Sequence, residues 1–379
     1  MIELSAEDSL RLNVLLANPL QAVRIDESAM TVYALSDEGE ASVKLNPQGR
    51  DEQYLKKVRE LLSSQVLGSP GGYPIFLRRW TRMGQARDDS LAQLLLLGEP
   101  EAIVAVVHAS GLDNEIARRA WWAMPVADNA RRMLEKDAVV SGSMGTVLAE
   151  YLVEFLPFET EHRAMMETVR LVLQPGLISD ELRDKLWLSA KRKNSYYIGF
   201  MDTIPDALPD SAKPRKDWQE LRERLKPLLD EGNVVARQLC RCLSERGQVF
   251  LGTAQAAMNK PVNQDVVVEL LKSIQRYFDS VCPANAPAAD INTVLSDAEA
   301  LLDVPPVCAT TTAVQELLRS VPEYRDDVKA MMTLARIGEP LVNPIFARSD
   351  AIGSVMRKKI APVMTPIQQQ LALLCGKAG

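Results

Sequence analysis

The stretch LLLLGEPEAI, residues 94–103, indicates the fold class of the chain. Gly98 follows a run of leucines at the position where helices commonly end in a left-handed residue, and Pro100 suits the first turn of a new helix. The stretch therefore predicts two helices joined by a short Gly-Glu-Pro turn. From about residue 76 onward, apolar residues recur with helical spacing, which predicts a mainly α chain.

A similar unit, LARIGEPLV, recurs at 334–342, where Gly338 takes the place of Gly98. In the same gapless alignment, the arginine pair at 118–119 falls on the lysine pair at 358–359. A helix, a turn, a second helix and a third helix with a basic pair are typical of HEAT-like repeats. We predict an irregular HEAT-like helical array. A non-repeating helical bundle has the same helix–turn–helix order and stays the alternative.

The first 75 residues have a different pattern. Ser5 can cap a first helix, which ends before the Asn-Pro pair at 18–19. Three short strand-like segments joined by turn residues follow, at 22–25, 30–35 and 41–45. We expect them to form a small antiparallel meander. A helix over about 51–65 comes next, and the sequence GSPGGYP at 68–74 breaks regular structure.

These patterns predict three domains. Residues 1–75 form an N-terminal α+β module, residues 76–204 a first helical lobe, and residues 215–379 a second helical lobe with a HEAT-like C-terminal unit. A proline-rich break over 203–214 separates the two lobes. We expect the last helix to run over 341–375.

Composition and charge limit the kind of protein. Of 379 residues, 47% are hydrophobic and 25% are charged, as in folded globular proteins. The net charge of −6 lacks the basic footprint of a DNA-binding protein, so no DNA partner is expected. No apolar run is long enough to span a bilayer, and the N-terminal residues do not form a signal peptide. We expect a cytoplasmic protein with no membrane insertion.

Motifs for common enzyme chemistry are missing from the sequence. It contains neither the phosphate-binding Gly-x-x-x-x-Gly-Lys-Ser/Thr loop nor the Gly-x-Ser-x-Gly nucleophile elbow. The two histidines, His108 and His162, do not have the spacing of a zinc hydrolase. We therefore expect no cofactor, no metal site and no catalytic residues, although the residues alone do not settle whether the protein is an enzyme.

Five cysteines are the main source of possible covalent chemistry. Cys240 and Cys242 lie two residues apart in a helical pattern, which favours core packing over a metal or redox role. The other three follow helices or lie near the C-terminus, where thiols can be exposed. The candidate reactive thiols are Cys282, Cys308 and Cys375.

Arginines and aromatic residues are interleaved in a way that suits partner binding. One cluster lies directly after the 68–74 break, a second over 118–122, and a third over 191–197. Aromatic rings flanked by cations can bind anionic partners or stack on single-stranded RNA. A linker followed by a solvated basic face is the alternative, and at least one tryptophan of the pair at 121–122 is expected to fill the core. The candidate partner-binding residues are Arg78, Arg79, Trp80, Arg82, Arg118 and Arg119.

Four strings carry a family resemblance: EDSLRLNVLLAN (7–18), GSPGGYPIFLRRWTRMGQ (68–85), LLLLGEPEAIVAVVHA (94–109) and ARRAWWAMP (117–125). Together they resemble the DsrS proteins of bacteria that oxidise stored sulfur through a reverse-acting dissimilatory sulfite reductase. The resemblance runs from the N-terminus through at least residue 200. It implies a cytoplasmic accessory protein of the sulfur-oxidation operon. The family offers no catalytic motif, so no residue here inherits a role, and the thiols lie outside these strings.

We therefore predict a non-enzymatic accessory or regulatory protein that acts by binding proteins of the sulfur-oxidation system. One alternative is a sulfur-transfer protein that carries a cysteine persulfide, which the five thiols favour. The other is an RNA-binding regulatory protein, which the basic-aromatic clusters favour.

Overall fold

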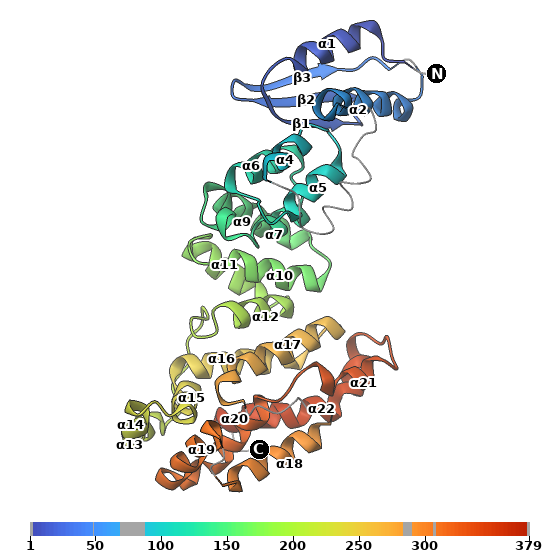
Figure 1. Cartoon of the computed structure of the whole chain (residues 1–379). Helices are drawn as coiled ribbons and strands as arrows, with labels where there is room; N and C mark the ends of the chain where they lie inside the picture. Colours follow the sequence, from blue (N-terminus) through green and yellow to red (C-terminus); the bar gives the residue numbers. More distant parts are fainter. Residues whose placement is uncertain (1–2, 48, 69–87, 283–289, 306–307, 377–379) are drawn as a thin grey trace. The chain divides into compact units, whose positions relative to one another are not determined.

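The computed structural model describes residues 3–47, 49–68, 88–282, 290–305 and 308–376. Most of these residues are helical, and a three-stranded antiparallel sheet lies near the N-terminus (Figure 1). The predicted mainly α class with an N-terminal α+β module is confirmed.

The residues group into two compact units. Unit 1 comprises Met1–Pro157 and Gln174–Ile178, and unit 2 comprises Phe158–Leu173 and Ser179–Gly379. The division into domains 1–75, 76–204 and 215–379 stays a prediction.

Unit 1 begins with the sheet and the two helices that cover it. The elements are α1 (Ala6–Leu16), β1 (Leu20–Asp26), β2 (Thr31–Ser36), β3 (Gly39–Lys44) and α2 (Asp51–Leu67). The strands pair in the order β1-β2-β3, as the predicted meander requires. Ser36 pairs with Gly39, whose φ of +121° closes the two-residue turn between β2 and β3.

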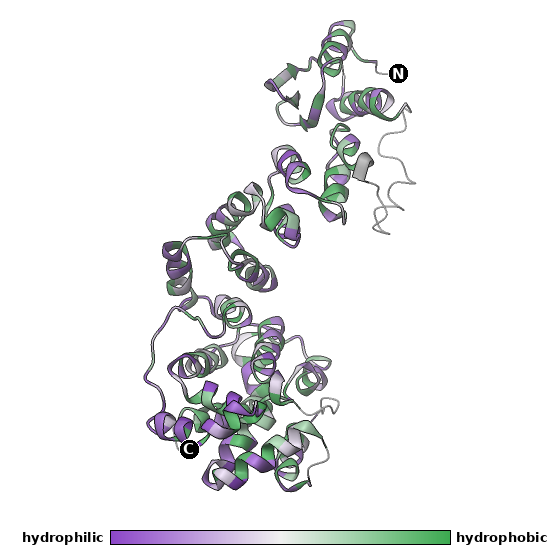
Figure 2. Ribbon diagram, turned by 60° about the vertical axis from the view of Figure 1, so that its left-hand side comes forward, coloured by the Kyte–Doolittle hydropathy of each residue, from purple (hydrophilic) through white to green (hydrophobic). Residues whose placement is uncertain are grey.

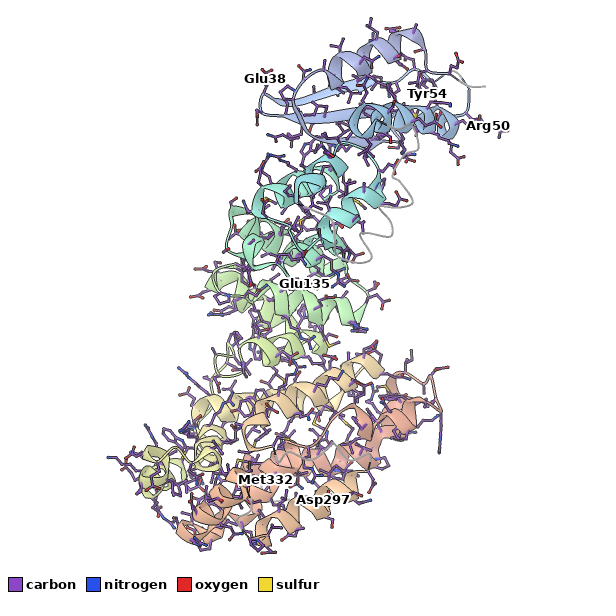
Figure 3. All side chains as sticks on the ribbon, in the orientation of Figure 1. Glu38, Arg50, Tyr54, Glu135, Asp297 and Met332 are labelled. Carbon is purple, nitrogen blue, oxygen red and sulfur yellow. The ribbon has the colours of Figure 1, made fainter. Side chains whose placement is uncertain are left out.

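One face of this sheet carries the first core. Val23, Val32 and Ala34 pack with residues of both helices, including Leu12, Tyr54 and Leu62. Asp8 is fully buried within it. Its carboxylate accepts hydrogen bonds from the Tyr54 hydroxyl and from the Asn46 amide, the latter at 2.8 Å. Tyr54 lies on α2 and is labelled in Figure 3. Both donors bind Oδ2 and replace water there, whereas Oδ1 is buried without a hydrogen-bond partner among the described residues.

Short helices complete unit 1: α4 (Asp88–Leu94), α5 (Pro100–His108), α6 (Asn114–Ala123), α7 (Ala127–Met133), α8 (Asp137–Val140), α9 (Ser143–Phe155) and the 3₁₀ turn η1 (Leu156–Phe158), which leads into unit 2. The predicted turn between α4 and α5 is confirmed: Gly98 has φ +63° and Pro100 opens α5. A Cβ at Gly98 would lie 3.1 Å from Ile25, so the turn also needs glycine for its close approach to the sheet.

Unit 2 consists of helices. They are α10 (His162–Val172), α11 (Asp180–Ala190), α12 (Asn194–Thr203), α13 (Trp218–Arg224), α14 (Lys226–Asp230), α15 (Val234–Leu243), α16 (Glu245–Asn259), α17 (Gln264–Tyr277), η2 (Asp279–Val281), α18 (Ile291–Asp303), α19 (Ala309–Ser320), η3 (Pro322–Tyr324), α20 (Arg325–Leu334), η4 (Glu339–Leu341), α21 (Asn343–Phe346) and α22 (Gly353–Leu374). These helices carry both apolar and polar residues (Figure 2), as expected for helices that bury one face and expose the other.

Helix α12 is central to the packing of the first helices of unit 2, since it contacts α10, α11, α16 and α17. Gly199 permits its close approach to α10, because a Cβ there would lie 2.6 Å from Val169. Ion pairs strengthen this junction. Arg170 of α10 pairs with Asp202 of α12 and with Glu269 of α17. The first helices of unit 2 therefore hold one another in a defined arrangement.

The C-terminal part differs from the sequence-based prediction. A single helix over 341–375 is wrong: η4 and α21 come first, and α22 begins only at Gly353. Gly353 has φ +59°, a conformation that separates the two helices. The second Gly-Glu-Pro turn also differs from the first. Gly338 is extended, with φ 173°, and a 3₁₀ turn follows it where α5 follows Gly98.

The buried hydroxyl of Tyr277 leads to a stability prediction. The ring stacks on Phe250 at 3.7 Å and lies under the Arg241 guanidinium at 3.8 Å, but among the described residues the hydroxyl has no hydrogen-bond partner. Tyr277→Phe keeps the ring contacts and removes an unsatisfied polar atom. It is expected to raise the free energy of unfolding by about 1 kcal/mol or more, measured by urea denaturation.

Tyr54→Phe is the matched control, because the Tyr54 hydroxyl donates to buried Asp8. It should lower stability by about 1–3 kcal/mol. Equal destabilisation by both substitutions would contradict the prediction for Tyr277.

Candidate functional site

The sequence-predicted partner-binding residues fall into two groups. Arg78, Arg79, Trp80 and Arg82 lie outside the described residues. Arg118 and Arg119 lie on α6 of unit 1, and both are partly buried. Only this second pair can be placed in its surroundings.

Arg118 and Arg119 share one carboxylate. Glu115, one turn earlier on α6, accepts from Arg118 at 2.7 and 2.9 Å and from Arg119 at 2.8 Å. The hydrogen bond from Arg118 is the main reason that the pKa of Glu115 is lowered to about 2. Arg118 also donates to the side-chain oxygen of Gln21 at 2.6 Å. Both cations therefore have partners within unit 1, and part of the charge expected for an anionic partner is already neutralised.

The neighbouring tryptophans also have contacts within unit 1. The Trp122 indole donates to Glu40 of β3 at 2.9 Å. The Arg24 guanidinium lies between the rings of Tyr33 and Trp122, at 4.6 and 4.9 Å from their centroids. Trp121 packs edge-on against Tyr151 at 4.7 Å. These rings join α6 to the sheet and to α9, so they do not form an open stacking platform for bases.

The five cysteines are all described, and none forms a disulfide. Cys242 is fully buried and Cys240 is partly buried, in keeping with the predicted packing role. Burial raises the pKa of the Cys240 thiol to about 11 and raises that of Cys242 as well. Cys282 is partly buried, donates to the Ala335 carbonyl at 3.3 Å, and has its pKa raised by burial. Cys375 is partly buried at the end of α22.

Cys308 differs from the other thiols in its surroundings. It is exposed and is the N-cap residue of α19, where the backbone amide of Thr311 donates to the sulfur. The Thr311 hydroxyl lies 3.4 Å from the same sulfur. Hydrogen bonding from Thr311 lowers the pKa of Cys308 below its usual value. Of the three candidate reactive thiols, Cys308 is the one whose environment favours a thiolate.

A further site, which the sequence did not reveal, lies wholly in unit 2. Trp187 of α11 and Tyr197 of α12 form one wall, Asp210 and its neighbours in the loop after α12 form another, and Gly252 and Ala256 of α16 form the floor. We call this hollow of about 190 Å³ the α16 groove. The two aromatic rings meet edge-to-face at 5.0 Å, which fixes the wall.

Two polar side chains of the α16 groove already use their donors within unit 2. The side-chain nitrogen of Gln248 already donates to the carbonyls of Cys242 and Leu374, at 2.9 and 3.1 Å. The Thr253 hydroxyl donates to the Val249 carbonyl at 2.8 Å. Asp210 adds a carboxylate, whose charge contributes, after burial, to the raised pKa of Tyr197. Asp210 therefore supplies the one formal charge among the described residues that line the groove, and a cationic ligand would complement it.

Sequence reasoning found the parts of this groove but not their assembly. The 191–197 cluster included Tyr197, and the break at 203–214 contains Asp210. Gly252 and Ala256, one helical turn apart on α16, are the signal that could have marked a shallow helix face. In the third cluster the other aromatic residue, Tyr196, is buried, and Lys193 lies 5.7 Å from its ring centroid.

Two general features complete the description of possible sites. Within the described ranges, no group of three or more His, Cys, Asp or Glu residues is placed to hold a metal ion. In the same part of the chain, no helix combines the length and the apolar character needed to cross a bilayer. Comparisons with protein-family models, with curated proteins and with solved structures find no match to this chain.

Proposed function

We propose that this protein is a non-enzymatic accessory protein that binds a partner protein through the α16 groove. The observation that carries the proposal is the groove itself: an aromatic wall and a floor without large side chains on packed helices, and a carboxylate in the loop after α12. Interfaces commonly centre on pockets of this kind, in which one residue of the partner is anchored.

The resemblance, carried by four strings between residues 7 and 125, supports a more specific version of this proposal. We propose on this basis a cytoplasmic protein with partners from the sulfur-oxidation system. Arg78, Arg79, Trp80 and Arg82 remain proposed as a second contact region. Full partner binding by a variant with all four residues changed to alanine would remove that assignment.

The groove can be tested by filling it. A Cβ at Gly252 meets nothing within 4 Å, so Gly252→Leu projects its side chain into the groove. Leucine is also a better helix former than glycine, and the variant is expected to fold. Asn259→Leu adds the same side chain at the exposed end of α16, outside the groove, and is the matched control.

The experiment starts with a pull-down from sulfur-oxidising cells with and without RNase, followed by calorimetry with the purified partner. Gly252→Leu is expected to weaken binding about ten-fold or more, and Asn259→Leu is expected to leave it unchanged. Equal binding by wild type and Gly252→Leu would contradict the proposal. Partners recovered only without RNase would favour the RNA-binding alternative.

A second candidate function, sulfur transfer, is favoured by the exposed Cys308 at the start of α19. Its thiolate would attack a terminal sulfur of a polysulfide. One S–S bond forms on Cys308, one breaks in the polysulfide, and the shortened polysulfide leaves with the electron pair. This candidate predicts a mass gain of about 32 Da, one sulfur atom, on Cys308. It predicts no such gain on that peptide in Cys308→Ser.

A further inference from the structure

We infer that the α16 groove binds a basic side chain, arginine or lysine, from an exposed segment of the partner protein. This inference rests on the proposed function, because it names the chemistry of the partner that the groove anchors. It follows from four features of the groove: its charge, its acceptors, its floor and its size.

Charge is the first feature. Asp210 is exposed and is the one formally charged residue among the described residues that line the groove. One of its oxygens accepts from the Ser211 amide at 2.9 Å. Among the described lysines and arginines, none forms an ion pair with Asp210, whereas Asp202 and Asp206 nearby in sequence both pair with arginine. A cation from outside the chain would complete this pairing.

The hydrogen-bonding groups of the groove also favour a positively charged ligand. The donors of Gln248 and Thr253 are used within unit 2, so these two side chains have only oxygen acceptors left. A carboxylate ligand would face the Asp210 charge, and the side-chain donors that line the groove, those of Trp187, Tyr197 and Ser211, are all neutral. A purely apolar ligand would cover polar atoms without satisfying them, which is costly. Guanidinium and ammonium groups carry several donors and no acceptor.

The floor of the groove leaves space for the methylene groups of an arginine or lysine side chain. Gly252 lies inside α16, where glycine costs up to about 1 kcal/mol relative to alanine. A Cβ there would meet nothing within 4 Å, so packing within the described residues does not require glycine. With Ala256 one turn later, it leaves space beside the Trp187–Tyr197 wall. Long basic side chains lay their methylene stems on such apolar surface, and their cations are attracted to aromatic faces.

The volume of the groove favours a single side chain over a cofactor as its occupant. Pockets for drug-sized molecules and cofactors measure about 300–1,000 Å³. The α16 groove has about 190 Å³. One extended side chain on a partner segment suits this volume better than a nucleotide or another large cofactor.

The test uses the full chain and a set of capped seven-residue Gly/Ser peptides that differ only at the central residue. The central residue is arginine, lysine, citrulline, norleucine or glutamate. Binding is followed by the NMR shift of the Trp187 indole N–H, assigned with Trp187→Phe. The arginine and lysine peptides are expected to bind about five-fold or more tightly than the citrulline peptide, which has nearly the shape of arginine without its charge.

Two variants isolate the carboxylate. Asp210→Asn should abolish the preference for arginine over citrulline. Asp230→Asn, on the exposed end of α14 and outside the groove, should retain that preference. Equal binding of the arginine, citrulline and glutamate peptides, or an unchanged preference in Asp210→Asn, would overturn the inference.

The two proposals fail in different ways. If Gly252→Leu blocks the partner but charged and neutral peptides bind alike, docking in the groove stands and the basic side chain is wrong. If Gly252→Leu leaves partner binding unchanged, the proposed function is wrong, whatever the peptides do. Loss of partner binding in both Gly252→Leu and Asp210→Asn, together with arginine-selective peptide binding, supports both proposals.

Discussion

An Arg215→Met variant is expected to lose about 3–5 kcal/mol of unfolding free energy in unit 2. Arg215 pairs with Asp217 at 2.8 Å and with Asp327 of α20, and its side chain is only 13% exposed. Asp327 is buried, and burial raises its pKa above the usual value even with Arg215 in place. Removing the cation leaves this carboxylate without its counter-charge, and that penalty exceeds the value of the pair itself.

The matched control is Arg224→Met. Arg224 also pairs with a carboxylate, Glu323, but both side chains are at least 40% exposed. Exposed pairs contribute at most about 1 kcal/mol because water screens them. Stability is measured from urea-dependent hydrogen exchange in α15 and α20, since one global transition is not assured for a chain of two units.

A double variant tests the cause. Arg215→Met combined with Asp327→Leu removes both buried charges, so it should recover most of the lost stability. A loss no larger for Arg215→Met than for Arg224→Met would contradict the prediction. Failure of the double variant to recover stability would show that the packing of Arg215, and not its charge, is what matters.

The elements that sequence predicted well are those with local causes. The strands of the N-terminal meander were predicted from alternating residues and turn chemistry, and their pairing follows from the short connections. The turn at Gly98–Pro100 was predicted from glycine and proline preferences at helix ends. The same rule failed at 338–340, because the residues after the turn form only a 3₁₀ turn and the four-residue helix α21.

The candidate site was harder to predict because its causes are not local. Trp187 and Gly252 lie on different helices, and nothing in their spacing indicates that α11, α12 and α16 come together. The pairing of Arg118 and Arg119 could have been foreseen. Glu115 precedes them by three and four residues, the spacing at which helical side chains meet. A count of basic residues alone does not reveal that Glu115 neutralises part of their charge.

The reactive thiol could be predicted only in part from the sequence. Sequence reduced five cysteines to three candidates without ranking them. The ranking comes from the helix cap, in which Thr311 follows Cys308 by three residues and places donors on the sulfur. This spacing matches that of the capping box, with cysteine in the place of serine and threonine in the place of glutamate or glutamine.

Cys308 is expected to be the first cysteine that iodoacetamide alkylates. The thiolate is the nucleophile, so a lowered pKa means a larger reactive fraction at a given pH below the pKa. Cys308 combines a lowered pKa with exposure, whereas burial raises the pKa of Cys240, Cys242 and Cys282. Each unit of pKa difference changes the thiolate fraction about ten-fold. Cys308 should therefore react faster than these three at pH 7.5, measured by peptide mass spectrometry.

The pH dependence of that rate tests the cause. The rate should rise with pH and level off at a midpoint below that of an ordinary thiol, because Thr311 stabilises the thiolate. Thr311→Val removes the hydroxyl and should move the midpoint upward and slow the reaction at pH 7.5. Thr310→Val is the matched control, since Thr310 contributes only its backbone amide, which valine retains. An unchanged midpoint in Thr311→Val would show that the hydroxyl does not activate Cys308, and faster labelling of Cys282 would remove Cys308 as the carrier of sulfur chemistry.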